Sequence, residues 1–198
     1  PQDLTSLRTL YQREYQQLPF SKDRQQHILN AILIKSYMKA IDETVTLTSE
    51  EERVLHDYLF SVEIWGLYEL SFFSSCSPLL SVQLLTKYTR EMLRKSDFLQ
   101  GVGKNRNMMH TLLLNGFMAC IEVDDFTNAL YFKKQIEKNF FEENETYFRI
   151  VYLWAEGLLD SKQGRAEEGQ RKMEDAVRIF EMIGCSKSAD YYRSAIEC

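Results

Sequence analysis

The most regularly spaced polar side chains lie in two stretches that are otherwise apolar. In residues 106–122 the line comprises Asn107, Thr111, Asn115, Met118 and Glu122. In residues 145–160 the comparable line comprises Glu145, Arg149, Tyr152, Glu156 and Asp160. Steps of three and four residues place each line on one face of a helix. A narrow polar line on a helix that is apolar elsewhere predicts that this face meets a groove or other buried polar groups.

The chemistry that these lines could perform is recognition of an extended peptide. An asparagine offers a donor and an acceptor together, which suits peptide amides, so Asn115 is the central candidate. Arg149 could hold a carboxylate or a backbone carbonyl. The candidate peptide-binding residues are therefore Asn115, Arg149, Thr111, Met118, Tyr152 and Tyr147. The alternative is that Asn115 and Arg149 bond to each other or to buried backbone, and serve only the fold.

Other potentially reactive residues form no catalytic or metal-binding pattern. His27, His56 and His110 fall in separate segments without a carboxylate or cysteine at ligand spacing. The segment 101–105 superficially resembles a phosphate loop, but it lacks the first glycine, the hydroxyl after the lysine and a preceding strand. The four cysteines are scattered without a CxxC pair, as expected of reduced thiols. We therefore expect no enzyme activity, no metal and no cofactor.

Composition and charge narrow the class of protein. The chain is 44% hydrophobic and 27% charged, which is typical of a globular protein. A net charge of −5 creates no field that attracts phosphates, so we expect no direct DNA binding by this chain. The longest nearly uncharged run, Leu70–Thr86, is broken by a polar segment and is too short for a membrane span. The start of the chain does not read as a signal peptide, and a cytoplasmic location is expected.

Helices are the predicted elements throughout, because the chain has only three prolines and no long alternation of polar and apolar residues. Thr48 and the acidic residues after it predict a helix start. Pro78 suits the first turn of another helix. The predicted helices cover residues 2–18, 23–42, 49–74, 78–95, 106–122, 125–138, 145–160, 165–183 and 187–196, with a loop at 97–105.

The later helices predict repeated hairpins. Ala129 and Phe132 recur in style as Ala176 and Phe180, a small-then-aromatic pattern typical of the second helix in tetratricopeptide repeats. The spacing and full consensus of that repeat are not kept. The predicted fold class is nevertheless all-α, a superhelical array of helical hairpins with tetratricopeptide-like repeats, whose concave side would form a groove.

Two segments carry a resemblance to a known family. His27–Asn30 through Leu59–Glu69, including the run Trp65-Gly66-Leu67-Tyr68-Glu69, and the closing segment Gly164–Tyr192 resemble the C-terminal region of Rgg/MutR transcriptional regulators of Gram-positive bacteria. The resemblance implies that residues 1–198 form a single helical-repeat domain for ligand sensing and dimerisation. It also implies an N-terminal helix-turn-helix domain that is missing from this sequence.

The resemblance further implies a function in quorum sensing. Members of the family respond to short hydrophobic signalling peptides, which asparagines and basic residues on groove-lining helices hold; Asn115 and Arg149 are the equivalent positions here. Dimerisation is expected through the apolar end of the chain at Tyr191–Ile196. DNA would be bound only by the missing domain. Two alternatives remain, a constitutive helical scaffold for a partner protein and an accessory module of an enzyme.

Overall fold

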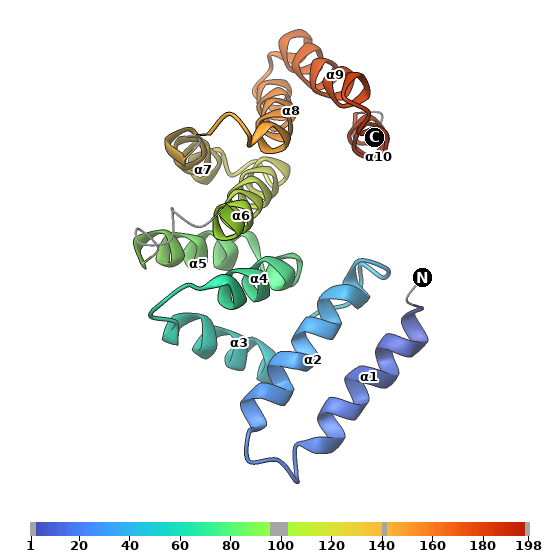
Figure 1. Cartoon of the computed structure of the whole chain (residues 1–198), viewed down its shortest axis with the longest axis vertical. Coiled ribbons are helices and arrows are strands. Elements are labelled where there is room, and N and C mark those ends of the chain that lie inside the picture. The colour runs from blue at the N-terminus through green and yellow to red at the C-terminus, as the bar shows by residue number, and fades with distance from the viewer. Residues whose placement is uncertain (1–2, 96–102, 140–141, 197–198) are drawn as a thin grey trace. The chain divides into compact units, whose positions relative to one another are not determined.

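The protein is all-helical in the computed structural model, which describes residues 3–95, 103–139 and 142–196 (Figure 1). No strand occurs in these ranges, so the predicted all-α class is confirmed. The chain divides into two compact units, residues 1–109 and 110–198. The elements are α1 (Leu4–Gln17), α2 (Arg24–Lys39), α3 (Ser49–Ser61), α4 (Leu67–Cys76), the 3₁₀ helix η1 (Ser77–Leu79), α5 (Val82–Lys95), α6 (Gly103–Glu122), α7 (Phe126–Asn139), α8 (Thr146–Lys162), α9 (Ala166–Met182) and α10 (Ser186–Ser194).

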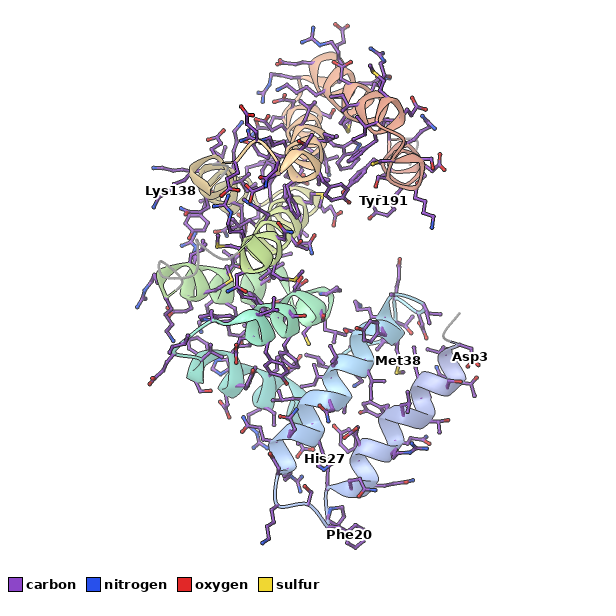
Figure 2. The ribbon with its side chains drawn as sticks, viewed as in Figure 1. Asp3, Phe20, His27, Met38, Lys138 and Tyr191 are labelled. Carbon is purple, nitrogen blue, oxygen red and sulfur yellow. The ribbon has the colours of Figure 1, made fainter. Side chains whose placement is uncertain are left out.

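Helix α2 is the central element of the first unit. It forms an antiparallel hairpin with α1, as the labelled Phe20 and His27 at one end and Asp3 and Met38 at the other make visible (Figure 2). It also contacts α3, α4 and η1. Packing on several sides requires apolar residues around much of the helix rather than along one stripe. Its buried residues accordingly include Ile28, Leu29, Ala31, Ile32 and Met38.

One buried carboxylate joins three helices of this unit. The Glu51 side chain is inaccessible to solvent and receives the Lys35 ammonium at 2.6 Å, the Tyr11 hydroxyl at 2.9 Å and the Tyr15 hydroxyl at 3.2 Å. It also accepts the backbone N–H of Thr48 at 2.6 Å, which completes a capping box at the start of α3. Burial alone raises the pKa of Glu51, but Lys35, Thr48 and Tyr11 outweigh burial and lower it below its usual range.

The single helix predicted over residues 49–74 is wrong, because the chain breaks between α3 and α4. Helix α3 ends at Ser61, and the extended Val62 follows it. The break lets Trp65, which has no exposed surface, enter the core between the two helices' ends. Lys95 donates to the Val62 carbonyl at 2.7 Å, which satisfies a backbone acceptor left by the break.

The helix predicted to begin at Pro78 is also displaced. Pro78 lies in η1, and α5 begins only at Val82. The Ser81 hydroxyl accepts the backbone N–H of Leu84 at 3.3 Å, so Ser81 caps α5. Proline tolerates the first turn of either helix type, and its presence alone could not distinguish them.

In the second unit three helix-to-helix turns share one geometry. The second residue after each helix end has a positive φ, at Asp124 (57°), Gly164 (86°) and Gly184 (78°). In each turn the next backbone N–H reaches back to a carbonyl of the preceding helix, as in Asp125 to Cys120 at 2.8 Å and Cys185 to Phe180 at 2.8 Å. This satisfies carbonyls that the helix end leaves free. The fourth residue of the helix that follows each turn is small and buried. It is Ala129 in α7, Gly169 in α9 and Ala189 in α10.

Helices α8 and α9 approach each other at their backbones. A Cβ at Gly157 would lie 2.6 Å from the carbonyl oxygen of Gly169. A Cβ at Gly169 would lie 2.6 Å from the backbone nitrogen of Ser161 and also meet the Gly157 carbonyl. Such Cβ atoms would also meet the side chains of Ser161 and Met173, but the backbone atoms cannot move aside as a side chain can, so the close packing depends on glycine at both positions.

We predict that Glu51→Gln lowers the free energy of unfolding by about 3–5 kcal/mol, because it leaves Lys35 buried without a counter-charge. Glu52→Gln, at an exposed neighbouring position, is the control and should change little. Since the folded-state pKa of Glu51 is lowered, its stabilisation is present above the unfolded pKa of about 4.3 and is lost as pH falls through the folded value. Urea unfolding from pH 7 downward should show the difference between wild type and Glu51→Gln shrinking below that pH; a difference that persists unchanged contradicts the assignment.

We predict that Gly169→Ala destabilises the chain by about 1–3 kcal/mol through overpacking. The direction of the change in stability is informative, because replacing glycine by alanine inside a helix otherwise stabilises a protein by up to about 1 kcal/mol. Thermal unfolding of Gly169→Ala beside Gln170→Ala, an exposed neighbour, measures the effect. A raised melting temperature for Gly169→Ala would show that the two backbones are not in close contact.

Candidate functional site

Helix α6 turns one line of its residues toward the surface of the second unit. Thr111, Asn115 and Met118 are half-buried, and Glu122 is exposed. The intervening apolar residues are buried; they include Leu112, Leu113, Leu114, Phe117 and Ile121. The line predicted from spacing therefore forms the partly accessible face of an otherwise buried helix.

Asn115 is the distinctive residue on this face. Within the described residues its side-chain amide makes no hydrogen bond, although the residue is half-buried. Arg149 is exposed, and its Nη2 lies 3.4 Å from the carbonyl oxygen of Glu142. An amide without an internal partner can bond to a ligand that brings both a donor and an acceptor.

Two residues of the polar line on α8, Tyr152 and Glu156, bond to side chains of α7. The Tyr152 hydroxyl donates to Glu137 Oε1 at 2.9 Å, and the Lys133 ammonium lies 2.6 Å from Glu156 Oε1. Burial and the nearby charges of Glu156 and Glu137 raise the pKa of Tyr152, so the hydroxyl stays protonated as a donor. The Tyr152 ring also lies 6.0 Å from the Phe117 ring of α6. This tyrosine thus joins three helices of the unit.

The two ends of the α8 line are buried carboxylates that lie next to basic side chains. Asp160 Oδ2 lies 2.6 Å from the Lys172 ammonium of α9, and Asp160 also pairs with Arg165 in the tight turn. Burial opposes ionisation of Asp160, but Lys172 and Arg165 prevail and lower its pKa. At the other end Glu145 Oε2 lies 3.1 Å from His110 Nε2. These contacts position helices and leave the carboxylates little freedom for chemistry.

Tyr147 belongs to a different cluster from Tyr152. Its ring lies 5.6 Å from Phe180 of α9, and Phe180 stacks at 5.6 Å on Tyr192 of α10. Trp154 of α8 completes the cluster, 5.2 Å from Tyr192. The structure therefore brings Tyr152 next to α6 and α7 and places Tyr147 with α9 and α10. Reasoning from spacing passed over Trp154, because a tryptophan on an apolar helix is ordinarily a core residue.

Two of the three histidines pair with carboxylates that the sequence does not place near them. His27 Nδ1 lies 2.6 Å from Glu14, and His110 Nε2 lies 3.1 Å from Glu145, the residue before α8. His56 instead lies 3.5 Å from its sequence neighbour Asp57. In the described ranges no three residues among His, Cys, Asp and Glu come together as a possible metal site. The loop predicted at 97–105 lies partly outside the described residues, and its last residues, 103–105, are helical instead. None of the helices searched is long and apolar enough to span a membrane.

Comparison with known proteins gives one family. The family described as the C-terminal domain of the HTH-type transcriptional regulator Rgg matches residues 9–194.

Solved structures agree with this match. The chain is 27% identical to the Streptococcus dysgalactiae SHP pheromone receptor Rgg2 in a Cys-to-Ser variant, with a TM-score of 0.79 over 98% of this chain and 72% of that one. A second structure of the same receptor gives 26% identity and a TM-score of 0.76 over 99% of this chain and 77% of that one. A transcriptional regulator from Listeria monocytogenes EGD-e, described as putative, shares the fold at 18% identity, with a TM-score of 0.78 over 98% and 67% of the two chains.

Proposed function

The chain belongs to the family of Rgg C-terminal domains of HTH-type transcriptional regulators, and from that premise we propose that it senses a short hydrophobic signalling peptide. The similar structures from Streptococcus dysgalactiae are described as pheromone receptors, which supports a peptide as the ligand. Peptide binding would control DNA binding or transcription activation by a helix-turn-helix domain elsewhere in the protein. The protein would act in the cytoplasm and need no cofactor.

The observation that carries this proposal is the Asn115 amide, half-buried on a helix that is otherwise apolar and without a hydrogen-bond partner in the described part of the chain. An extended peptide presents one N–H and one C=O per residue, which match the acceptor and donor of an asparagine. Thr111 and Met118 flank Asn115 on the same face and would add a hydroxyl and an adaptable apolar contact.

Residues of α8 would extend the site. Arg149 is exposed and offers a guanidinium to a carboxylate or carbonyl of the peptide. Tyr152 and Tyr147 would contribute apolar ring surface, Tyr152 beside α6 and Tyr147 beside α9. A peptide that prefers one arrangement of the helices would shift the population toward it, and this differential affinity is the signal passed to the DNA-binding domain.

We predict that Asn115→Ala weakens peptide binding by about 1–3 kcal/mol, on the order of 10- to 100-fold, with nearly unchanged stability. An equimolar pool of short synthetic peptides built from Leu, Ile, Val and Phe serves as the probe, and calorimetric titration and tryptophan fluorescence report binding. Arg149→Ala is measured in parallel.

The control is Glu122→Ala, at the exposed end of the same line. A lowered melting temperature for Asn115→Ala with unchanged affinity would assign Asn115 to the fold. Failure of the wild-type chain to bind any member of the pool would contradict peptide sensing itself.

A second prediction concerns assembly, since we also propose that the domain is a homodimer. Tyr191 is 68% exposed at the end of the chain, and Ile196 lines a groove of about 440 Å³ between α9 and α10 together with Val177. Tyr192, in contrast, is buried within its own chain. Light scattering at tens of micromolar should give the mass of two chains, and Tyr191→Glu should lower it. A monomer mass for the wild-type chain contradicts the dimer.

A further inference from the structure

The indole N–H of Trp154 is a buried donor that no acceptor reaches in the part of the chain that the structure describes. Trp154 is 5% exposed, and its Nε1 has no hydrogen-bond partner among the described residues. An unpaired donor removed from water costs free energy, which a ligand regains when it brings an acceptor to that donor. A donor of this kind is completed when a ligand supplies the missing acceptor.

The surroundings of this nitrogen are aromatic. Tyr192, Phe180 and Tyr147 follow one another with ring centroids 5.6 Å apart, and Tyr192 lies 5.2 Å from the indole. The cluster reaches the surface at two points, Tyr147 with 47% and Tyr191 with 68% of its surface exposed. Figure 2 labels Tyr191 on the short terminal helix α10. Exposed tyrosine rings next to a buried aromatic core form adaptable contacts for apolar side chains.

We propose that Trp154 donates its indole N–H to a backbone carbonyl of the bound peptide, while Tyr147 contacts an apolar side chain of that peptide. This inference rests on the proposed peptide-sensing function and extends it to the cluster between α8, α9 and α10. A backbone carbonyl is the acceptor that every peptide carries. It is also neutral, so it enters an aromatic pocket at a far lower desolvation cost than a carboxylate.

The proposal requires a side chain to move, because the nitrogen is shielded from solvent. The Tyr192 ring is the neighbour most suited to this, since it belongs to α10, a helix of only nine residues at the edge of the unit. Displacement of Tyr192 would also loosen its stacking on Phe180 of α9. Peptide binding at Trp154 would thereby change how α10 packs, which is a discrete structural response to the ligand.

The second tryptophan provides an internal control. Trp65 lies in the first unit with no exposed surface, and its Nε1 likewise has no partner in the described residues. Its ring neighbour is the fully buried Phe73, 5.6 Å away. Trp65 therefore resembles Trp154 chemically, but its aromatic neighbour is a buried phenylalanine and not a cluster that ends in exposed tyrosines. The nuclear magnetic resonance signal of its indole N–H should therefore not respond to a peptide.

The test uses the chain labelled with ¹⁵N-tryptophan, which gives two indole N–H signals that Trp65→Phe and Trp154→Phe assign. On titration with the pool of Leu, Ile, Val and Phe peptides, we expect the Trp154 proton signal to move downfield, as hydrogen bonding requires, and the Trp65 signal to stay. Replacing Trp154 by a tryptophan isostere with sulfur in place of N–H keeps the ring volume. This replacement should weaken peptide binding about 10-fold, as expected for one lost hydrogen bond.

The same isostere should not reduce thermal stability without peptide, because it removes an unpaired donor. If the pool binds but the Trp154 signal does not move, or if the isostere binds with wild-type affinity, the role of Trp154 is wrong while peptide sensing stands. If an Asn115→Ala chain loses affinity and the isostere does not, the site is confined to α6. If no peptide binds the wild-type chain, both proposals fail.

Discussion

In both units, buried charged groups must have partners, and this requirement constrains how the helices pack. The described residues contain three buried carboxylates, Glu51, Glu145 and Asp160, and each lies within 3.1 Å of a cationic or titratable partner from another element. A helix that buries a carboxylate without such a partner would lose more free energy than its apolar contacts return. The positions of these three residues therefore decide which helices can be neighbours.

Glu51 shows how one such contact organises a unit. It begins as a local feature, the N3 glutamate of a capping box whose N-cap residue is Thr48 at the start of α3. Its remaining lone pairs then accept donors from α1 and α2, so the start of α3 is fixed against the hairpin. Asp160 has the corresponding role in the second unit, where Lys172 and Arg165 join the end of α8 to the turn and to α9. Close backbone contact between α8 and α9 follows at Gly157 and Gly169.

Against this background the unpaired polar groups stand out as places where a ligand can contribute. Asn115 on α6 and the indole nitrogen of Trp154 on α8 both lack partners in the described part of the chain. One is half-buried on an accessible face and the other is shielded by aromatic rings. Both kinds of group favour a neutral, hydrogen-bonding ligand with apolar side chains, which is the chemistry of a short hydrophobic peptide.

The sequence by itself determined the helical class, most helix positions in the second unit, and the face of α6 that carries Asn115, because periodicity and turn residues act over a few neighbouring positions. It did not determine the break at Val62–Gly66, since burial of Trp65 is a property of the packed core. Nor could spacing reveal that His110 pairs with Glu145, or that Tyr147 and Tyr152 serve different clusters. Those contacts join residues that are distant along the chain. Only the tertiary structure decides them, because the free energy of a buried polar group depends on every element that packs around it.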